Sequence, residues 1–174
     1  MGTACKQVIA DVLTETAPKD KDLLVLCSDS RGSGSLGPFY QKFPEHAIEV
    51  GIAEQDLVGI SAGLASCGKH PYAVSPASFL STRSIEQIKV DVCYSKTNVK
   101  LIGISGGVSY GALGVSHHST EDIAILRALP NMVVVVPCDN IEAEAATHAV
   151  FEYEGPVFYR CGYKNEKDIH HTDA

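Results

Sequence analysis

A single carboxyl group stands where a short apolar stretch passes directly into a predicted helix. Glu54 lies in the segment GIAEQ (residues 51–55), in the first turn of that helix. A carboxyl group at the end of a sheet, half buried by Ile52 and Leu57, favours its protonated form and can exchange a proton with a ligand. The simpler interpretation is a favourable interaction between Glu54 and the positive end of the helix dipole. Under either interpretation, Glu54 begins a helix.

Two adjacent histidines, His117 and His118, lie on a long, glycine-rich segment at residues 105–122. Loops of this length are usually functional or disordered. An imidazole on such a loop could transfer protons or contact a substrate, although an exposed histidine pair often has no role. Because no third ligand accompanies the pair at metal-ligand spacing, no metal site is predicted in this chain.

Two further segments follow predicted strands and have unusual compositions. Residues 28–37 (SDSRGSGSLG) could present backbone N–H groups and hydroxyls to a phosphate, although most such loops are only flexible connections. Residues 75–83 (SPASFLSTR) place Phe79 among small residues, which leave room for a flat ring to lie against it. Aromatic residues are nevertheless more often part of the core.

The elements that must position these segments alternate between strands and helices. Short apolar runs rich in β-branched residues recur between stretches of helical spacing, and several are apolar on both faces, as strands covered on both sides must be. This pattern predicts a three-layer αβα domain around a mainly parallel sheet of about six strands. Ligands of such sheets bind at the carboxyl ends of the strands, which is where the segments above lie.

The expected strands lie at residues 23–27, 47–50, 72–75, 99–104, 132–136 and 157–160. The expected helices lie at residues 3–16, 53–67, 84–94, 121–129 and 140–152. Asn140 is a natural N-cap for the last helix. One domain is expected over residues 1–163, followed by a polar tail over residues 164–174.

Composition and charge exclude several classes of function. Of the 174 residues, 45% are hydrophobic and 20% are charged, which is the range of ordinary globular domains. The net charge of −7 leaves no basic face for nucleic acid or for an anionic membrane surface. No apolar run reaches the ~18 residues that span a bilayer, and the chain starts without a secretory signal. We therefore expect a soluble, cytoplasmic protein whose six cysteines stay reduced.

Several motifs, in the same order, give the chain a resemblance to a known family. The segments GIAEQ (residues 51–55), SAGLA (residues 61–65), SHHSTEDIA (residues 116–124), RALPNM (residues 127–132) and VPCD (residues 136–139) resemble the central region of transketolases, which use thiamine diphosphate. The resemblance runs from about residue 3 to residue 163. It implies that the chain is the pyrimidine-binding domain of a transketolase and acts in two-carbon ketol transfer between sugars.

The resemblance also implies roles for individual residues toward the cofactor. Glu54 matches the glutamate that hydrogen-bonds a ring nitrogen of the aminopyrimidine and promotes deprotonation of the thiazolium carbon. Phe79 matches the aromatic residue that stacks on the pyrimidine, with Leu80 as the competing position. Asp29 is expected near the pyrimidine end of the cofactor.

On the substrate side, the resemblance places His117 at a sugar-binding histidine and Ser33 at a serine that helps to hold the substrate phosphate. Three positions depart from the family pattern. Ser105 replaces a second histidine, Leu113 an acidic residue, and Val136 a phosphate-binding arginine. Because the loss of a guanidinium removes a charge-assisted contact, these departures disfavour a standard phosphosugar substrate.

The family's diphosphate-binding domain, with its metal ligands, is not found in these residues. We therefore expect the chain to be half of a cofactor site, as a fragment or as one subunit of a split enzyme. Mg²⁺ or Ca²⁺ would be bound by the partner domain, and the chain would form a homo- or hetero-oligomer that is inactive without that domain.

Two other interpretations remain open. One is a domain like that of 1-deoxyxylulose-5-phosphate synthase or of a 2-oxoacid dehydrogenase beta subunit, although the stretch HHSTED (residues 117–122) favours transketolase. The other is a non-catalytic module of the same fold, used for assembly or regulation.

Overall fold

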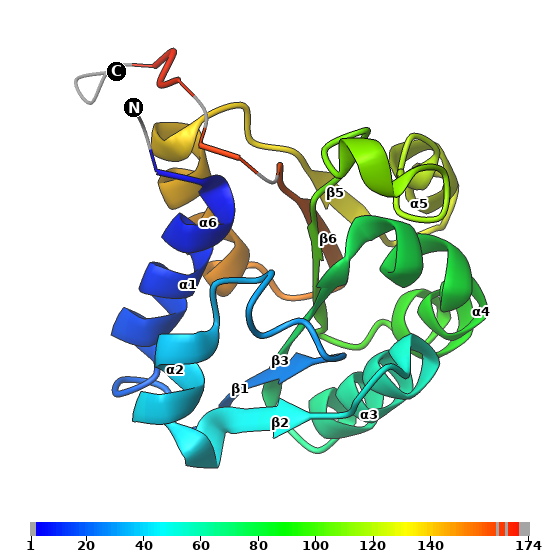
Figure 1. The fold of residues 1–174 in the computed structure, drawn as a ribbon. Coiled ribbons are helices and arrows are strands. Elements are labelled where there is room, and N and C mark those ends of the chain that lie inside the picture. Colours follow the sequence, from blue (N-terminus) through cyan, green and yellow to red (C-terminus); the bar gives the residue numbers. More distant parts are fainter. Residues whose placement is uncertain (1–2, 163, 166, 171–174) are drawn as a thin grey trace.

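Six parallel strands lie between two layers of helices in the computed structural model, which describes residues 3–162, 164–165 and 167–170 (Figure 1). The strands occur in the order β2-β1-β3-β4-β6-β5. Their bounds are β1 Leu23–Cys27, β2 Ala47–Glu49, β3 His70–Pro76, β4 Lys100–Ile104, β5 Val133–Val135 and β6 Val157–Arg160. The predicted three-layer α/β fold with a parallel sheet is thus confirmed.

The helices form two layers, one on each face of the sheet. Helices α1, α2 and α6 pack against one face, and α3, α4 and α5 lie on the other (Figure 1). Their bounds are α1 Cys5–Thr16, α2 Gly37–Lys42, α3 Glu54–Ser66, α4 Ile85–Gln87, α5 Asp122–Arg127 and α6 Asn140–Glu152. No helix among the described residues is long and apolar enough to cross a membrane.

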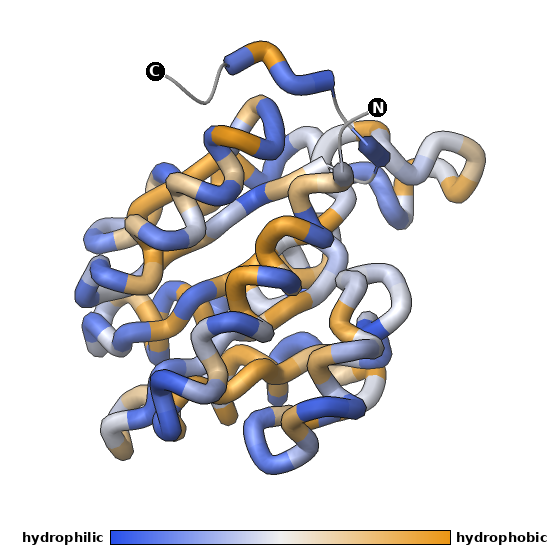
Figure 2. Tube along the Cα trace, turned by 90° about the vertical axis from the view of Figure 1, so that its left-hand side faces the viewer, coloured by the Kyte–Doolittle hydropathy of each residue, from blue (hydrophilic) through white to orange (hydrophobic). Residues whose placement is uncertain are grey.

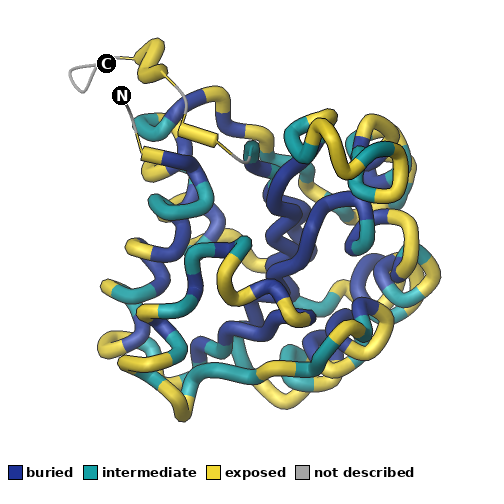
Figure 3. Tube along the Cα trace, in the orientation of Figure 1, coloured by how far each residue is buried: buried dark blue, intermediate teal, exposed yellow. Residues whose placement is uncertain are grey.

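The sheet separates two hydrophobic cores. One core joins α1, α6 and one face of the strands, with Leu13 and Val25 fully buried. The other joins α3 and α5 to the opposite face, with Leu57, Leu101 and Leu126 fully buried. Apolar and buried residues run along the central strands, whereas the helices alternate between apolar inner and polar outer positions (Figures 2 and 3). Each fully buried leucine contributes roughly 1.5–3 kcal/mol to folding.

The strand order places a switch point at the carboxyl ends of β1 and β3, which we call the crevice. The chain leaves β1 for β2 on one side and later returns to β3 on the other side. The connections after these two neighbouring strands therefore diverge, which is the point where parallel α/β sheets bind ligands. Residues 28–37 follow β1, residues 77–83 follow β3, and α3 begins shortly after β2.

Two helical segments differ from expectation. The helix expected at residues 84–94 begins earlier and is largely π-helical, with Phe79–Arg83 and Ile88–Tyr94 flanking α4. Its apolar residues do not distinguish a π-helical from an α-helical turn, and π-helical turns are frequent at functional sites. Helix α2 was not expected, because its six residues are too few to show a helical period. Residues 171–174 of the expected tail lie outside the described residues.

The expected N-cap of α6 is wrong by one residue. Asp139, not Asn140, caps the helix, since its Oδ1 accepts from the backbone N–H of Glu142 at 2.9 Å. Its Oδ2 accepts from the backbone N–H groups of Ile169 at 2.8 Å and His170 at 2.7 Å. These hydrogen bonds, first that from His170, hold the pKa of Asp139 well below its usual value, although burial opposes them. Asp139 therefore ties the segment after β6 to the start of α6.

We expect Asp139→Ala to lower the melting temperature at pH 7, and the loss to shrink as the pH falls below about 4, the ordinary pKa of an unfolded aspartate. A carboxyl group whose pKa is depressed by folding stabilises the protein above its unfolded pKa, and this stability is lost as the pH falls through its native pKa. Melting temperatures of both proteins between pH 3 and 7 test this. Asn140→Ala is the control, and a loss that does not vary with pH would contradict the prediction.

Candidate active site

Glu54 is the first residue of α3 and is only 1% exposed. Its Oε2 accepts from Arg83 Nη1 at 2.5 Å, and its Oε1 lies 3.4 Å from Ser28 Oγ. Ser28 Oγ also lies 2.8 Å from Ser75 Oγ, and this contact joins the ends of the neighbouring strands β1 and β3. The carboxylate is thus buried in the crevice and held by a cation and a hydroxyl.

The expected cover of Glu54 by Ile52 is wrong. The side chain of Ile52 points to solvent and is 75% exposed, whereas Leu57 is fully buried as expected. Polar groups close over Glu54 instead, because a buried carboxylate requires hydrogen-bond and charge partners. Arg83 and Ser28 supply them, and neither was singled out from the sequence. Ser28 and Ser75, two serines at the ends of apolar strands, are the sequence feature that could have indicated polar surroundings for Glu54.

Phe79 lies beside Arg83, the partner of Glu54, and precedes it by one turn of the π-helix Phe79–Arg83. The guanidinium carbon of Arg83 lies 4.8 Å from the centre of the Phe79 ring, a cation–π contact. The Phe79 ring is half-buried, whereas Leu80 is fully buried in the core between α3 and the sheet. Of the two candidate stacking positions, only Phe79 therefore reaches the group around Glu54.

His117 meets Phe79 from the long loop after β4. The two rings lie edge to face with their centres 5.1 Å apart, and the ring of Tyr110 contacts His117 in the same way at 5.4 Å. His117 Nδ1 is 3.0 Å from Ser116 Oγ. His118 instead places its Nε2 3.0 Å from the carbonyl oxygen of Gly111, within its own loop. The structure thus assembles Glu54, Phe79 and His117 and separates the two histidines.

A buried ion pair anchors the base of this loop. Arg160 Nε donates to Asp122 Oδ2 at 2.9 Å, and Asp122 is fully buried. Gly107 and Ser119 exchange two backbone hydrogen bonds of 2.8 Å, which close the loop. A Cβ on Gly106 would lie 2.3 Å from Arg160 Nε, so only glycine fits there. The position of His117 depends on these contacts.

Asp29 and Ser33 lie on the loop after β1. Their hydrogen bonds are with Glu49, Ser30 and Lys6, and none that the structure records for them involves Glu54, Phe79 or His117. Asp29 is exposed, with a φ of +51°, and its N–H donates to Glu49 Oε1 at 2.7 Å. Ser33 Oγ donates to the carbonyl oxygen of Ser30 at 3.2 Å. The carbonyl oxygen of Ser33 accepts from Lys6 Nζ at 2.8 Å, and burial lowers the pKa of Lys6.

Glu49 holds the loop after β1 in place. This role of Glu49 was not predicted from the sequence. Its Oε1 accepts from the N–H groups of Asp29 and Gly51, and its Oε2 accepts from Cys27 Sγ at 3.1 Å and pairs with Arg31 at 3.3 Å. Burial works to raise the pKa of Glu49, but these hydrogen bonds prevail and hold it below its ordinary value. Glu49 therefore fixes the start of the loop on which Asp29 and Ser33 lie.

One group of potential metal ligands lies away from this site. Cys138, Asp139 and His170 place their ligand atoms within 4.8 Å of one another, between β5 and the described residues after β6. Asp139 already accepts hydrogen bonds there from three backbone N–H groups. The group is separate from Glu54 and its partners.

Comparisons with known proteins identify the family. The family model for the transketolase pyrimidine-binding domain matches residues 2–165. The chain belongs to the transketolase family. Its 1-deoxyxylulose-5-phosphate synthase relatives, such as that of Bacillus cereus, are more distant, at 32% identity over 96% of this chain and 26% of that protein.

Several of the more similar relatives of this transketolase domain are named as subunits. It is 47% identical over 98% of its length to one subunit of the apulose-4-phosphate transketolase of Phocaeicola vulgatus, and it covers 54% of that subunit. It is 36% identical over 89% of its length to the 6-deoxy-6-sulfo-D-fructose transketolase subunit SqwH of a Clostridium species, of which it covers 48%. The chain thus spans about half the length of these relatives.

A solved structure described as a split gene transketolase, an inactive beta4 tetramer, has a TM-score of 0.87 and 35% identity. It matches 99% of this chain, which covers 55% of that one. The transketolase of Campylobacter jejuni has a TM-score of 0.89 at 20% identity, which shows the shared fold.

Removing the cation at the base of the His117 loop tests how that loop is held. We expect Arg160→Met to lower the free energy of unfolding by about 3–5 kcal/mol, because it leaves the buried Asp122 carboxylate unpaired. The double variant Arg160→Met/Asp122→Asn should lose less than the sum of the two single losses. Urea unfolding of the four proteins measures this coupling, and additive losses would show that the pair does not act as a unit.

Proposed function

We propose that this chain supplies the pyrimidine half of a thiamine-diphosphate site in a two-subunit transketolase, which transfers a two-carbon ketol group between sugars. The observation that supports this most is the burial of Glu54 in the crevice at the carboxyl ends of β1 and β3. When bound, the cofactor supplies the carbon nucleophile for the sugar carbonyl. The protein's part is to orient the cofactor, exclude water and move protons.

Glu54 is the proposed proton-handling group. Arg83 holds Oε2, which fixes the orientation of the carboxyl group. Oε1 has only the long 3.4 Å contact with Ser28, so it keeps a lone pair for a donor on a ligand. A carboxyl group in a site of low dielectric can hydrogen-bond the pyrimidine ring nitrogen and share a proton with it. The residues present therefore fit an aminopyrimidine.

Phe79 is the proposed stacking surface. Arg83 and His117 contact its ring, so the ring is held in place before a ligand binds. A half-buried aromatic ring beside a buried carboxylate offers an apolar face and an acceptor together, which is what a flat, protonatable heterocycle requires. We place Asp29 near the same end of the cofactor.

His117 and Ser33 are the proposed substrate contacts. His117 carries a titratable imidazole beside Phe79, suited to a hydrogen bond or a proton transfer with a sugar hydroxyl. The substrate is a sugar or a sugar phosphate. Leu113 and Val136 are exposed apolar side chains, 56% and 42% accessible, and offer no charge to a phosphate.

The other half of the site is proposed to come from a partner. A diphosphate-binding domain or subunit would bind the diphosphate and its Mg²⁺ or Ca²⁺, and this chain would be inactive without it. The assembly is expected to be a homo- or hetero-oligomer in the cytoplasm. Its relatives named as subunits support this proposal.

We expect Glu54→Gln to reduce ketol transfer by roughly 10²–10⁴-fold in a mixture with the diphosphate-binding partner, because an amide cannot take or return the proton. Asp56→Asn, which neutralises an exposed carboxylate in the same turn of α3, should leave the rate unchanged. Turnover and circular dichroism of the three proteins test this. Equal turnover of Glu54→Gln and the unaltered chain would refute the proposed role.

Phe79→Leu should weaken thiamine-diphosphate binding in the same mixture by several-fold, since stacking contributes about 0.5–1.5 kcal/mol beyond burial. Tyr94→Leu is the matched control, because Tyr94 is 83% exposed and lies away from the site. Calorimetric titration of cofactor with Mg²⁺ into each mixture gives the affinities. The same affinity in Phe79→Leu as in Tyr94→Leu would remove the stacking role.

A further inference from the structure

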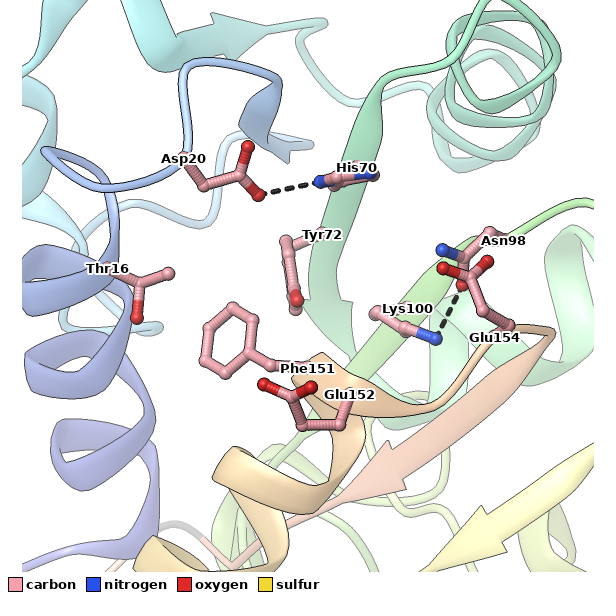
Figure 4. A pocket seen from close by; sticks show the side chains of 9 residues that line it. All are labelled: Thr16, Asp20, His70, Tyr72, Asn98, Lys100, Phe151, Glu152 and Glu154. Atoms are coloured by element: carbon pink, nitrogen blue, oxygen red, sulfur yellow. Dashed lines mark hydrogen bonds and ion pairs between the residues drawn. The ribbon is translucent and has the colours of Figure 1, made fainter.

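A pocket lies at the amino ends of β3 and β4 (Figure 4), at the opposite edge of the sheet from Glu54. Its volume is about 210 Å³. Its lining comes from the end of α1 and the turn after it, from β3 and β4, and from the end of α6. The transketolase chemistry proposed above uses none of these residues.

Two aromatic rings form the apolar wall of the pocket. Tyr72 and Phe151 lie with their ring centres 4.9 Å apart and their planes tilted by 50°. Tyr72 is only 3% exposed, yet its hydroxyl makes no hydrogen bond with the residues that the structure describes. The hydroxyl is not among the buried side-chain atoms without a partner, so it opens into the pocket, where water or a ligand can donate to it. Figure 4 shows it directed into the pocket.

The charged groups around the rings are mostly acidic. Asp20 and Glu152 come from different elements, and both carboxylates act on the Tyr72 hydroxyl. Burial first, and then these two charges, raise the pKa of Tyr72, so the hydroxyl keeps its proton and offers its lone pairs. Glu154 adds a third carboxylate at the rim. Both oxygens of Asp20 already have a partner: Oδ2 lies 2.6 Å from His70 Nδ1, and Oδ1 accepts from the backbone N–H of Asp22 at 2.9 Å.

The cation in the lining does not neutralise this site. Lys100 Nζ donates to Asn98 Oδ1 at 2.6 Å and to the carbonyl oxygens of Tyr153 at 2.6 Å and Gly155 at 2.9 Å. These three acceptors use all the donors of an ammonium group. Burial also lowers the pKa of Lys100 to about 8. Lys100 keeps its positive charge and interacts with Glu154, but the three carboxylates of Asp20, Glu152 and Glu154 outnumber it, so the pocket has an excess of negative charge beside an apolar wall.

We propose that this pocket binds a small aliphatic ammonium ion. The ammonium group would donate to the Tyr72 hydroxyl and pair with Glu152 and Asp20, and its alkyl chain would lie against the rings of Tyr72 and Phe151. An ammonium beside aromatic faces also gains cation–π attraction. The site is independent of the transketolase activity and lies at the other edge of the sheet.

The test is calorimetric titration of the 174-residue chain with 1,4-diaminobutane at constant ionic strength, with 1,4-butanediol as the neutral match. We expect one saturable site for the diamine and none for the diol. Tyr72→Phe removes only the hydroxyl and should weaken the diamine by about tenfold, and Glu152→Gln should weaken it by at least about tenfold.

Glu144→Gln is the matched control, because Glu144 is an exposed carboxylate on α6 outside the pocket. It should leave the affinity within about twofold, the effect of losing one distant, screened charge. Equal weakening by Glu144→Gln and Glu152→Gln would show non-specific attraction to an acidic chain and would overturn the proposal. Equal binding of the diol, or no saturable binding of the diamine, would also overturn it.

Discussion

The direction of the strands is the constraint that places the group around Glu54 and the pocket beside Tyr72. Because all six strands run parallel, every carboxyl end lies on one edge of the sheet and every amino end on the other. The divergence of the connections after β1 and β3 opens a crevice at the first edge, and Glu54 enters it at the start of α3. The opposite edge gathers the ends of α1 and α6, which bring Asp20 and Glu152 to the ring of Tyr72. The fold thus separates two acidic sites by the length of the strands.

Electrostatics explains why the crevice is built from polar side chains. A buried carboxylate is unfavourable unless charges and hydrogen bonds replace the water that it loses. At Glu54 only a few groups replace the lost water: the guanidinium of Arg83, the more distant hydroxyl of Ser28 and the N-terminus of α3. Asp122 differs from Glu54, because each of its carboxylate oxygens accepts a hydrogen bond within the protein, one from the backbone N–H of Ile123 and one from Arg160. The first carboxylate keeps capacity for a ligand, and the second is structural.

Much of the fold followed from the sequence, and the reasons for the exceptions are physical. The strands at residues 23–27 and 157–160 have the expected bounds, since apolar runs covered on both faces end where polar residues begin. Glu54, Phe79 and His117 lie in one group through Arg83 and the Phe79 ring, and their roles stay a prediction. The arrangement of their neighbours could not be predicted, because it depends on tertiary contacts. Glu49, for example, reads as an ordinary strand-end residue, but two of its four contacts, those with Asp29 and Arg31, hold the loop after β1.

Exposed apolar side chains near Glu54 and on the His117 loop fit the proposal that a partner subunit completes this site. Ile52 is 75% exposed beside Glu54, and Val108 and Val115 are 63% and 90% exposed on the loop that carries His117. Large exposed apolar side chains are unfavourable in water, and a partner that covers them removes this cost. Covering them would also exclude water from Glu54, and a proton shared between a carboxyl group and a ring nitrogen requires a site of low dielectric. In the proposed enzyme, the contact that assembles the subunits therefore also creates the environment in which Glu54 works.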